Sequence, residues 1–500
     1  MGGERSRMRT VAALSAMALL VAQGCTVGPK YRAPAPPAVT GYTPQPLPGA
    51  TAGSAGAAGA AQRLSASADL PADWWTLLRS PELDGMMREA LAASPTLAEA
   101  TARLKQTQEE LKARRGAARF PTVSGNASVE EEQLNLAAYG IPFPNPSPFT
   151  LLDGSVAVSY ALDIFGANRR LIESLRAQRD YEAWQVEGAR LMLAGNVASA
   201  AIRQAQIRAA MDLTRQMLGV EERQLRIAEK RYRAGGVAES EVHSQQTLLA
   251  ETQATLPGLE QELDAVNDEL AVLMGKPPAQ ARVAAISLDR LRLPEELPVS
   301  LPSALVRQRP DIRAAEALLH EASANVGVAT ANLYPQIVLT GSGGAIGTGF
   351  TSGGGIWNAE GALTQPIFNG GALRAERRKA QAAFEEAGGV YRQTVLAAFQ
   401  QVADSLYAIE HDAQTLAART EAANQAEASY RIAAGRYRAG GISQEALLDA
   451  ERQRLQTELD RTGAAAARYA DSVALLQALG GGWWNAQHAV VARQAPARVP

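Results

Sequence analysis

Hydrophobic and small or polar residues alternate in four short segments of this chain. Such alternation predicts β-strands with one apolar face. The first pair is TVSGNASVE (Thr122–Glu130) and SVAVSYALDIF (Ser155–Phe165), and the second is QIVLTGSGG (Gln336–Gly344) and IWNAEGALTQPIF (Ile356–Phe368). Turn-rich stretches separate the members of each pair. We therefore expect two β-hairpins, at about 120–132 with 153–165 and at about 335–346 with 356–368, whose strands are long enough to cross a bilayer when tilted.

A long helical pattern follows each predicted hairpin. Neither Ala167–Arg233 nor Ala372–Arg438 contains a proline, and in both the apolar residues recur with helical spacing. A helix of about 65 residues would extend roughly 100 Å, which is too long for a compact domain. We therefore expect each long helix to pair with the helical run that follows it, at Ala238–Leu256 and at Gln444–Leu459, as an antiparallel hairpin.

The hexapeptide RYRAGG occurs twice, at Arg231–Gly236 and at Arg436–Gly441. Glycine after a basic last turn is typical of a helix end, because glycine adopts the left-handed conformation there and arginine complements the negative end of the helix dipole. Each RYRAGG is thus predicted to be the turn of a helical hairpin. Ser443 is the expected N-cap of the helix that follows the second turn.

These landmarks recur in the same order at an offset of about 205 residues, which indicates a tandem duplication of one large unit. The predicted organisation is a signal peptide at 1–24, an acylated extended linker at 25–72, a first repeat at 73–275, an inter-repeat linker at 276–300, a second repeat at 301–480 and a C-terminal tail at 481–500. The hairpin tips lie at 231–236 and 436–441.

Four strands with membrane-type patterning cannot close a barrel alone, and a spanning sheet cannot leave unpaired edges in lipid. The barrel must therefore be shared between chains. Two chains would supply eight strands, whose interior is filled by side chains, whereas three chains would supply twelve and leave an open lumen. The pattern predicts an oligomeric duct that is continued by a helical tube.

The only cysteine, Cys25, follows an arginine-containing segment and the apolar stretch VAALSAMALLVA (Val11–Ala22). This arrangement fits a secretory signal and is too short to span a bilayer. The sequence AQGC resembles a bacterial lipobox, in which the cysteine is diacylated and becomes the mature N-terminus. The alternative is an incidental buried cysteine.

The remaining composition argues against several classes of protein. The 49 basic and 51 acidic residues are nearly balanced, so we expect no nucleic-acid partner. The four histidines are dispersed, are expected on helix or tail surfaces and show no metal-site spacing, so we predict no enzyme, no metal and no cofactor. The run GSGGAIGTGFTSGGG (Gly341–Gly355) lacks the lysine of a phosphate loop and is interpreted as an extracellular hairpin loop.

Three further stretches carry a family resemblance. They are CTVGPKYRAP (Cys25–Pro34), WWTLLRSPELDGMMREALAASPTLAEATARL (Trp74–Leu104) and LPSALVRQRPDIRAAEALL (Leu301–Leu319). With the repeats, they resemble the TolC-like outer membrane factors, in the lipoprotein subgroup that serves multidrug efflux pumps. The resemblance implies an α+β membrane protein: a homotrimeric transmembrane β-barrel of twelve strands, four from each chain, continued by a long α-helical coiled-coil barrel in the periplasm.

The same resemblance implies partners and sites. The partners would be a periplasmic adaptor protein, an inner-membrane pump and outer-membrane lipid, with Cys25 as the anchor; Thr26 in place of aspartate favours sorting to the outer membrane. Tyr437, Asp449 and Arg452 would form a closing gate, whereas the equivalents of Asp449 and Arg452 in the first repeat, Ser244 and Thr247, are uncharged. The expected tip and adaptor-contact residues are Tyr232, Arg233, Gly235, Gly236, Arg438, Gly440 and Gly441.

The predicted function is that of an outer-membrane duct that passively conducts small molecules from a tripartite efflux pump to the exterior. One alternative is the duct of a type I protein secretion system. A less favoured one is a lipid-anchored periplasmic coiled-coil scaffold without a channel.

Overall fold

The computed structural model describes residues 26–46, 48–65, 69–140, 142–144, 147–349 and 353–486. They form two compact units, each assembled from three separate parts of the sequence. Unit 1 contains the N-terminal residues through Pro34 with Leu104–Glu182 and Ala315–Tyr391. Unit 2 contains Ala35–Arg103, Ala183–Ala314 and the residues from Arg392 onward. Among the described residues, no helix combines the length and the apolar character that crossing a membrane requires.

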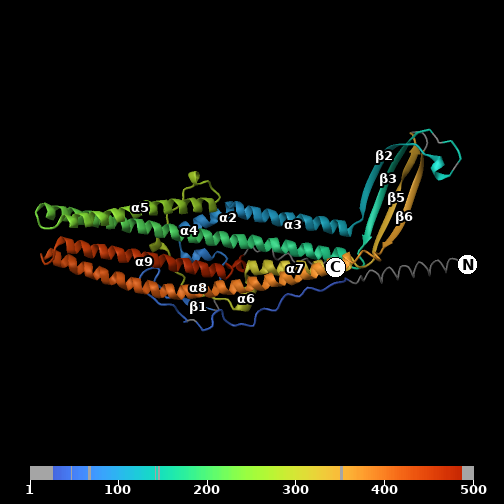
Figure 1. Cartoon of the computed structure of the whole chain (residues 1–500). Coiled ribbons are helices and arrows are strands. Elements are labelled where there is room, and N and C mark those ends of the chain that lie inside the picture. Colours follow the sequence, from blue (N-terminus) through green and yellow to red (C-terminus); the bar gives the residue numbers. More distant parts are fainter. Residues whose placement is uncertain are drawn as a thin grey trace. The chain divides into compact units, whose positions relative to one another are not determined.

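Unit 1 holds an antiparallel sheet with the strand order β2-β3-β5-β6 (Figure 1). The strands are β2 (Thr122–Glu132), β3 (Phe149–Leu162), β5 (Gln336–Thr348) and β6 (Gly353–Thr364). The first repeat supplies β2 and β3 and the second supplies β5 and β6, so the pairing of β3 with β5 joins the two repeats. One edge of β2 and one edge of β6 have no strand partner among the described residues.

The register gives the sheet two chemically different faces. Val123 pairs with Val158, which pairs with Gly341, and the same face carries Val129 and Trp357. The opposite face carries Ser124, Asn126, Asp153, Asn358 and Glu360. The four strands contain no lysine or arginine.

The strand boundaries differ from the predicted ones. The strand expected at 153–165 begins at Phe149 and ends at Leu162, and the one expected at 356–368 spans Gly353–Thr364. The glycine run at 341–355, interpreted as a loop, lies largely within β5 and β6. That interpretation was wrong because glycine also permits close strand approach: a Cβ on Gly344 would lie 2.3 Å from the carbonyl oxygen of Gly154.

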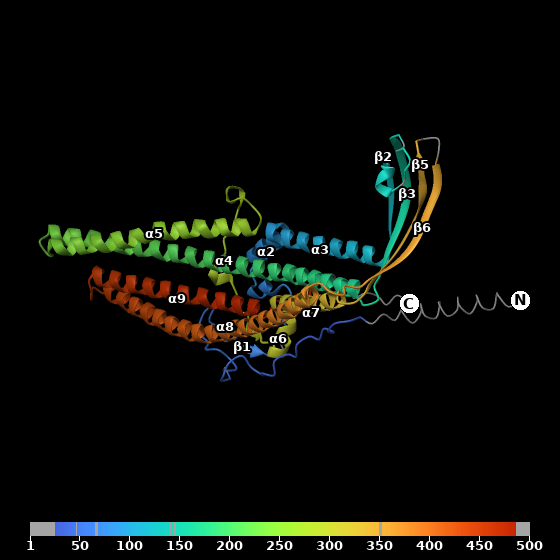
Figure 2. The same cartoon turned by 45° about the vertical axis from the view of Figure 1, so that its right-hand side comes forward.

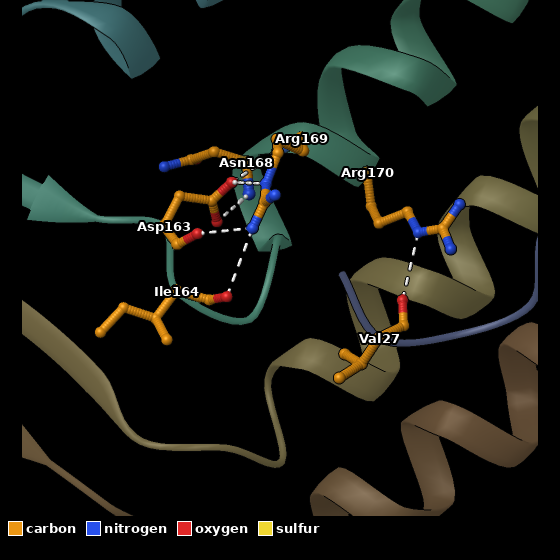
Figure 3. A network of polar contacts seen from close by, with 6 residues as sticks. All are labelled: Val27, Asp163, Ile164, Asn168, Arg169 and Arg170. Carbon is orange, nitrogen blue, oxygen red and sulfur yellow. Dashed lines mark hydrogen bonds and ion pairs between the residues drawn. The ribbon is translucent and has the colours of Figure 1, made fainter. Parts of the chain in front are cut away.

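Both long helices begin and end at the predicted residues. Helix α4 spans Ala167–Arg233 and helix α8 spans Ala372–Arg438. At the start of α4, the Asp163 carboxylate accepts hydrogen bonds from the backbone amides of Asn168 and Arg169, both at 2.9 Å (Figure 3). A carboxylate at this position satisfies amides that have no partner within the helix and is favoured by the helix dipole.

Helix α5 (Glu239–Leu273) runs beside α4, and α9 (Gln444–Ala478) runs beside α8 (Figures 1 and 2). The predictions that the return helices end at Leu256 and Leu459 were wrong, because α5 continues through Pro257 to Leu273 and α9 continues to Ala478. Proline removes one backbone hydrogen bond and strains the preceding turn. Buried residues on both sides of it, among them Val242 and Leu270, supply packing that keeps the helix continuous.

The shorter helices frame the repeats. The segment before the first strand divides at Ser94 into α2 (Pro81–Ala93) and α3 (Pro95–Arg119), because Pro95 restricts the residue before it to extended backbone. Helices α6 (Pro302–Gln308) and α7 (Pro310–Ala331) meet at Arg309. The remaining short helices are η1 (Trp74–Leu78), η2 (Leu136–Tyr139), η3 (Pro278–Gln280), η4 (Leu288–Arg290) and η5 (Trp483–Asn485).

Arg309 explains part of the RPDIRAAE motif. Its side chain is nearly buried, and its guanidinium donates to the carbonyl oxygen of Ala478 at 2.9 Å and to Gln401 Oε1 at 2.8 Å. It also pairs with the Asp311 carboxylate at 2.6 Å. One residue thus connects the start of the second repeat with α8 and with the end of α9.

The segment expected as an extended linker at 25–72 is attached to unit 2 by specific contacts. Within it, β1 (Arg63–Ser65) pairs in parallel with β4 (Glu296–Pro298). The fully buried guanidinium of Arg468 donates to the carbonyl oxygens of Ala58 and Ala60, both at 2.8 Å. Composition could not predict these contacts of the extended linker, because contacts made through backbone carbonyls leave no apolar periodicity.

Candidate functional site

The first tip ends α4 with the hydrogen bonds of a Schellman motif. Gly235 has φ +73°, its amide donates to the carbonyl oxygen of Tyr232 at 2.9 Å, and the amide of Gly236 donates to that of Arg231 at 2.7 Å. These two hydrogen bonds satisfy backbone carbonyl groups at the end of the helix. They require a residue that tolerates the left-handed conformation. The sequence prediction of a helix stop at this glycine is confirmed.

The second tip repeats the motif at the end of α8. Gly440 has φ +72°, and the amides of Gly440 and Gly441 donate to the carbonyl oxygens of Tyr437 and Arg436 at 3.0 and 2.8 Å. The next helix begins with the predicted N-cap, since the Ser443 hydroxyl accepts a hydrogen bond from the amide of Ala446 at 3.2 Å.

The other predicted tip residues lie on the surface around these turns. Tyr232 and Tyr437 are both exposed, at 42% and 38% of their surface. The guanidinium of Arg233 donates to the carbonyl oxygen of Glu229, and that of Arg438 donates to that of Ala434, both at 3.3 Å. The two turns therefore present an aromatic and a basic side chain each.

Near the tips, α4 of the first repeat packs against α9 of the second. Met217 and Val220 of α4 form a buried cluster with Leu448 and Leu455 of α9. The repeats are thus joined in unit 2 by an apolar seam.

Polar contacts continue this seam toward the tips. Gln224 Nε2 donates to Asp449 Oδ1 at 2.7 Å, and Arg223 forms an ion pair with Glu451 at 2.9 Å. Arg231 of the first RYRAGG pairs with Glu445 in the first turn of α9.

A buried carboxylate lies in the same region. Glu221 is 1% exposed; its Oε1 accepts a hydrogen bond from the Thr252 hydroxyl at 3.1 Å, and its Oε2 has no hydrogen-bond partner in the described part of the chain. Burial raises the pKa of Glu221, while the Thr252 hydroxyl and the charge of Arg452 act in the opposite direction. The charge of Arg452 on α9 therefore acts on a carboxylate of α4.

Of the three predicted gate residues, Asp449 and Arg452 both face α4 within one chain. No ion pair joins Asp449 to Arg452, although both are among the described residues; Asp449 accepts a hydrogen bond from Gln224, and the charge of Arg452 acts on Glu221. The sequence analysis missed these partners. The signal was available, because Glu221 and Gln224 are polar residues in a helical series that otherwise reads Met217, Val220 and Ile227.

The remaining predictions concern the acylated cysteine and the histidines. Cys25 and His488 lie outside the described residues. His320, expected on a helix surface, is half-buried: its Nε2 lies 3.0 Å from Glu173 Oε1, and its ring stacks on that of Tyr31. Within the described part of the chain, no three histidine, cysteine, aspartate or glutamate side chains are grouped to hold a metal ion.

Known proteins share both the sequence and the fold of this chain. The family described as outer membrane efflux protein matches residues 86–276 and 301–481. The pyoverdine export outer membrane protein OpmQ of Pseudomonas aeruginosa is 33% identical over 420 residues, which cover 82% of this chain and 87% of OpmQ.

Two solved structures extend the similarity to the fold. The outer-membrane channel OprN matches with a TM-score of 0.79 and 27% identity, over 92% of this chain and all of OprN. VceC of Vibrio cholerae matches with a TM-score of 0.73 and 27% identity, over 83% of this chain and all of VceC. The chain therefore belongs to the outer membrane efflux protein family and has the fold of its TolC-like channels.

Proposed function

We propose that three copies of this chain form the outer-membrane duct of a tripartite efflux pump. The duct conducts small molecules passively, and an inner-membrane transporter selects them and supplies the energy. The main support is a four-stranded sheet with an apolar face and unpaired edges, in a chain of the outer membrane efflux protein family.

The sheet supports a barrel shared between chains. The edges of β2 and β6 carry backbone groups that lipid cannot hydrogen-bond, and pairing β2 of one copy with β6 of the next would satisfy them. Val129 and Trp357 on the apolar face are 74% and 82% exposed in the single chain, and lipid would cover them. Three copies would contribute twelve strands, enough for an open lumen.

The junctions between strands and helices fit a membrane boundary. Phe120 precedes β2, Tyr334 precedes β5 and Phe368 follows β6, and all three are exposed. Phe165, which follows β3, stacks on Tyr334 with ring centroids 4.8 Å apart. Aromatic residues at this level are typical of the girdles of transmembrane barrels.

Helix α8 carries an apolar surface suited to a second copy. Leu396, Tyr407 and Ile432 are exposed and lie on one face of α8, since their spacing is close to whole helical turns. In a trimer this face would pack against the helices of a neighbouring chain.

The lipid anchor and the pump contacts complete the proposal. Cys25, in its lipobox-like sequence, would be acylated and hold the chain in the outer membrane. The two tips would dock the periplasmic adaptor through Tyr232, Arg233, Arg438 and their paired glycines, because exposed glycine turns allow close backbone approach. Tyr437, Asp449 and Arg452 would hold the resting duct shut.

Reconstitution tests this assignment directly. The full-length protein, purified from membranes in detergent, is cross-linked with a short amine-reactive reagent and inserted into planar lipid bilayers. We expect a cross-linked product of three chains and discrete single-channel currents. A product of one chain without currents would contradict both the trimer and the duct.

A further inference from the structure

The segment Thr26–Tyr31, here called the N-terminal strap, is held against α4 and α7 within unit 1. The amide of Val27 donates to the carbonyl oxygen of Phe165 at 3.2 Å. The guanidinium of Arg170 donates from Nε to the carbonyl oxygen of Val27 at 3.1 Å (Figure 3). Its Nη2 donates to the carbonyl oxygen of Gly28 at 3.3 Å. The strap thus contacts the end of β3 and the first turn of α4.

Arg170 depends on the strap for its hydrogen bonds. The residue is 4% exposed, and a buried guanidinium is costly unless its donors find acceptors. Its Nη1 donates to Glu173 Oε2 at 2.8 Å, and Glu173 Oε1 lies 3.0 Å from His320 Nε2 on α7. Without Val27 and Gly28, two of the three acceptors of Arg170 would be lost.

The fit between the strap and the helices is also steric. Gly28 has φ +92°, and a Cβ there would lie 2.5 Å from the Cα of Gly327 on α7. A Cβ on Gly327 would lie 2.7 Å from the Cδ of Arg170. The ring of Tyr31 stacks on that of His320 with a centroid distance of 4.2 Å and an interplanar angle of 13°. Two glycines therefore let the strap, α7 and the Arg170 side chain approach one another closely.

The residues that hold the strap, namely Phe165, Arg170, His320 and Gly327, are here called the seat. We propose that the seat fixes the position of the lipid anchor proposed at Cys25, with Arg170 as the positioning residue. Thr26 at the start of the strap lies against Gly166 in the β3–α4 connection, since a Cβ on Gly166 would lie 2.9 Å from its Cγ2. Acylation of Cys25 would therefore attach lipid directly before a segment that is fixed to this connection. The anchoring role rests on the acylation under "Proposed function", whereas the seat itself rests on contacts between described residues.

The first test disrupts the strap and leaves both helices unchanged. Lys30 and Arg32 are exposed, and trypsin cleaves after them when the strap leaves its seat. In the detergent-purified full-length protein, we expect Gly28→Ala to raise the cleavage rate about tenfold or more, because the cleaved population follows the free energy of local opening. Gly41→Ala is the matched control, since nothing lies within 4 Å of a Cβ at that position. Equal cleavage rates in the two variants would overturn the seat.

The second test acts from the helix side. Arg170→Gln should accelerate amide hydrogen exchange of the strap, including the Val27 amide. Arg215→Gln on the same helix should not, because the ion pairs of Arg215 with Asp212 and Glu260 do not involve the strap. Unchanged exchange in the β3 and α4 peptides would show that the fold is intact. If Arg170→Gln does not fold, Gly28→Ala decides the matter alone.

The mass of the N-terminal peptide tests the anchoring role separately from the contacts that hold the strap. A peptide with acyl groups on Cys25 and slow cleavage in the unaltered protein supports an anchor fixed by the seat. A peptide without acyl groups would overturn the anchoring role and the proposed acylation, whereas the cleavage comparison would still decide on the seat.

Discussion

Asp449 accepts a hydrogen bond from Gln224, so its carboxylate already joins α9 to α4 within one chain. The charge of Arg452 on α9 lowers the pKa of the buried Glu221 on α4 and so partly opposes the effect of burial. Helix periodicity located Asp449 and Arg452 on one face of α9 but could not show that this face packs against α4, because the contact joins residues about 225 positions apart. Asp449, a predicted gate residue, is therefore part of the polar contacts between the two repeats.

The gate prediction concerns these contacts. Replacing both Asp449 and Arg452 with alanine should raise the single-channel conductance in lipid bilayers, because contacts that hold α9 near its resting position are lost. The control replaces the first-repeat equivalents, Ser244 and Thr247, with alanine, which should leave the conductance low. Gln224→Ala removes only the hydrogen bond to Asp449 within one chain, so its conductance shows the effect of that bond apart from any contacts between chains. An unchanged conductance in the double variant would rule out the gate assignment.

A second residue-level prediction concerns Asp471 of α9. Burial, together with a hydrogen bond to and repulsion from the Asp412 carboxylate, raises the pKa of Asp471 to about 7. Between its ordinary pKa of 3.8 and this value, the folded protein binds a proton that the unfolded chain has lost. The free energy of unfolding should therefore fall as the pH rises through this window and level off above it.

Asp471→Asn should remove this dependence, because an amide cannot lose a proton in this range. We expect thermal unfolding of the unaltered protein to begin at a lower temperature at pH 8 than at pH 5, and the variant to show a smaller difference between these two pH values. An equal difference in the two proteins would contradict the raised pKa of Asp471.

At the scale of elements, local sequence chemistry located most boundaries. RYRAGG located the ends of α4 and α8, because glycine in the left-handed conformation is a local requirement. Pro257 misled the prediction, since tertiary packing along α5 outweighs a local break. The N-terminal strap was invisible for the opposite reason: Arg170 binds its carbonyl groups, which every residue carries.

The element-scale prediction concerns the second tip. Gly440→Ala should destabilise the turn by about 1–2 kcal/mol, because a side chain disfavours the left-handed conformation. Gly435→Ala, five residues earlier in α8, should stabilise the helix by up to about 1 kcal/mol, since alanine is the better helix former and no atom crowds that position. Amide exchange at 436–446 measures both effects. Similar protection in the two variants would contradict the role of Gly440.

At the scale of the whole molecule, the repeats, the strands and the long helices could be predicted from the sequence, because period-two alternation and uninterrupted helical spacing leave strong patterns. The contacts between repeats could not. The strand order β2-β3-β5-β6 and the seam between α4 and α9 both join residues from different repeats. Neither repeat is a separate folding unit, since the two compact units each draw on both.

The whole-molecule prediction separates a channel from a lipid-anchored scaffold. Cys25→Ser removes the acylation site but leaves the apolar face of the sheet intact. We expect the variant protein to require detergent for extraction and to remain in solution only with detergent, because Val129 and Trp357 would otherwise face water. Release into buffer without detergent would favour the scaffold.

The pairing of β3 with β5 has a consequence for how the protein can change over time. If six identical half-chains formed the duct, each substitution would appear at six positions around the ring. In the proposed trimer of fused halves this number is three, so one half can acquire a charged side chain that the other half lacks. Asp449 and Arg452 of the second repeat are charged, whereas Ser244 and Thr247 at the equivalent positions of the first repeat are not. This difference is such a divergence. The covalent link between repeats thus gives the duct two independently adjustable sets of tips.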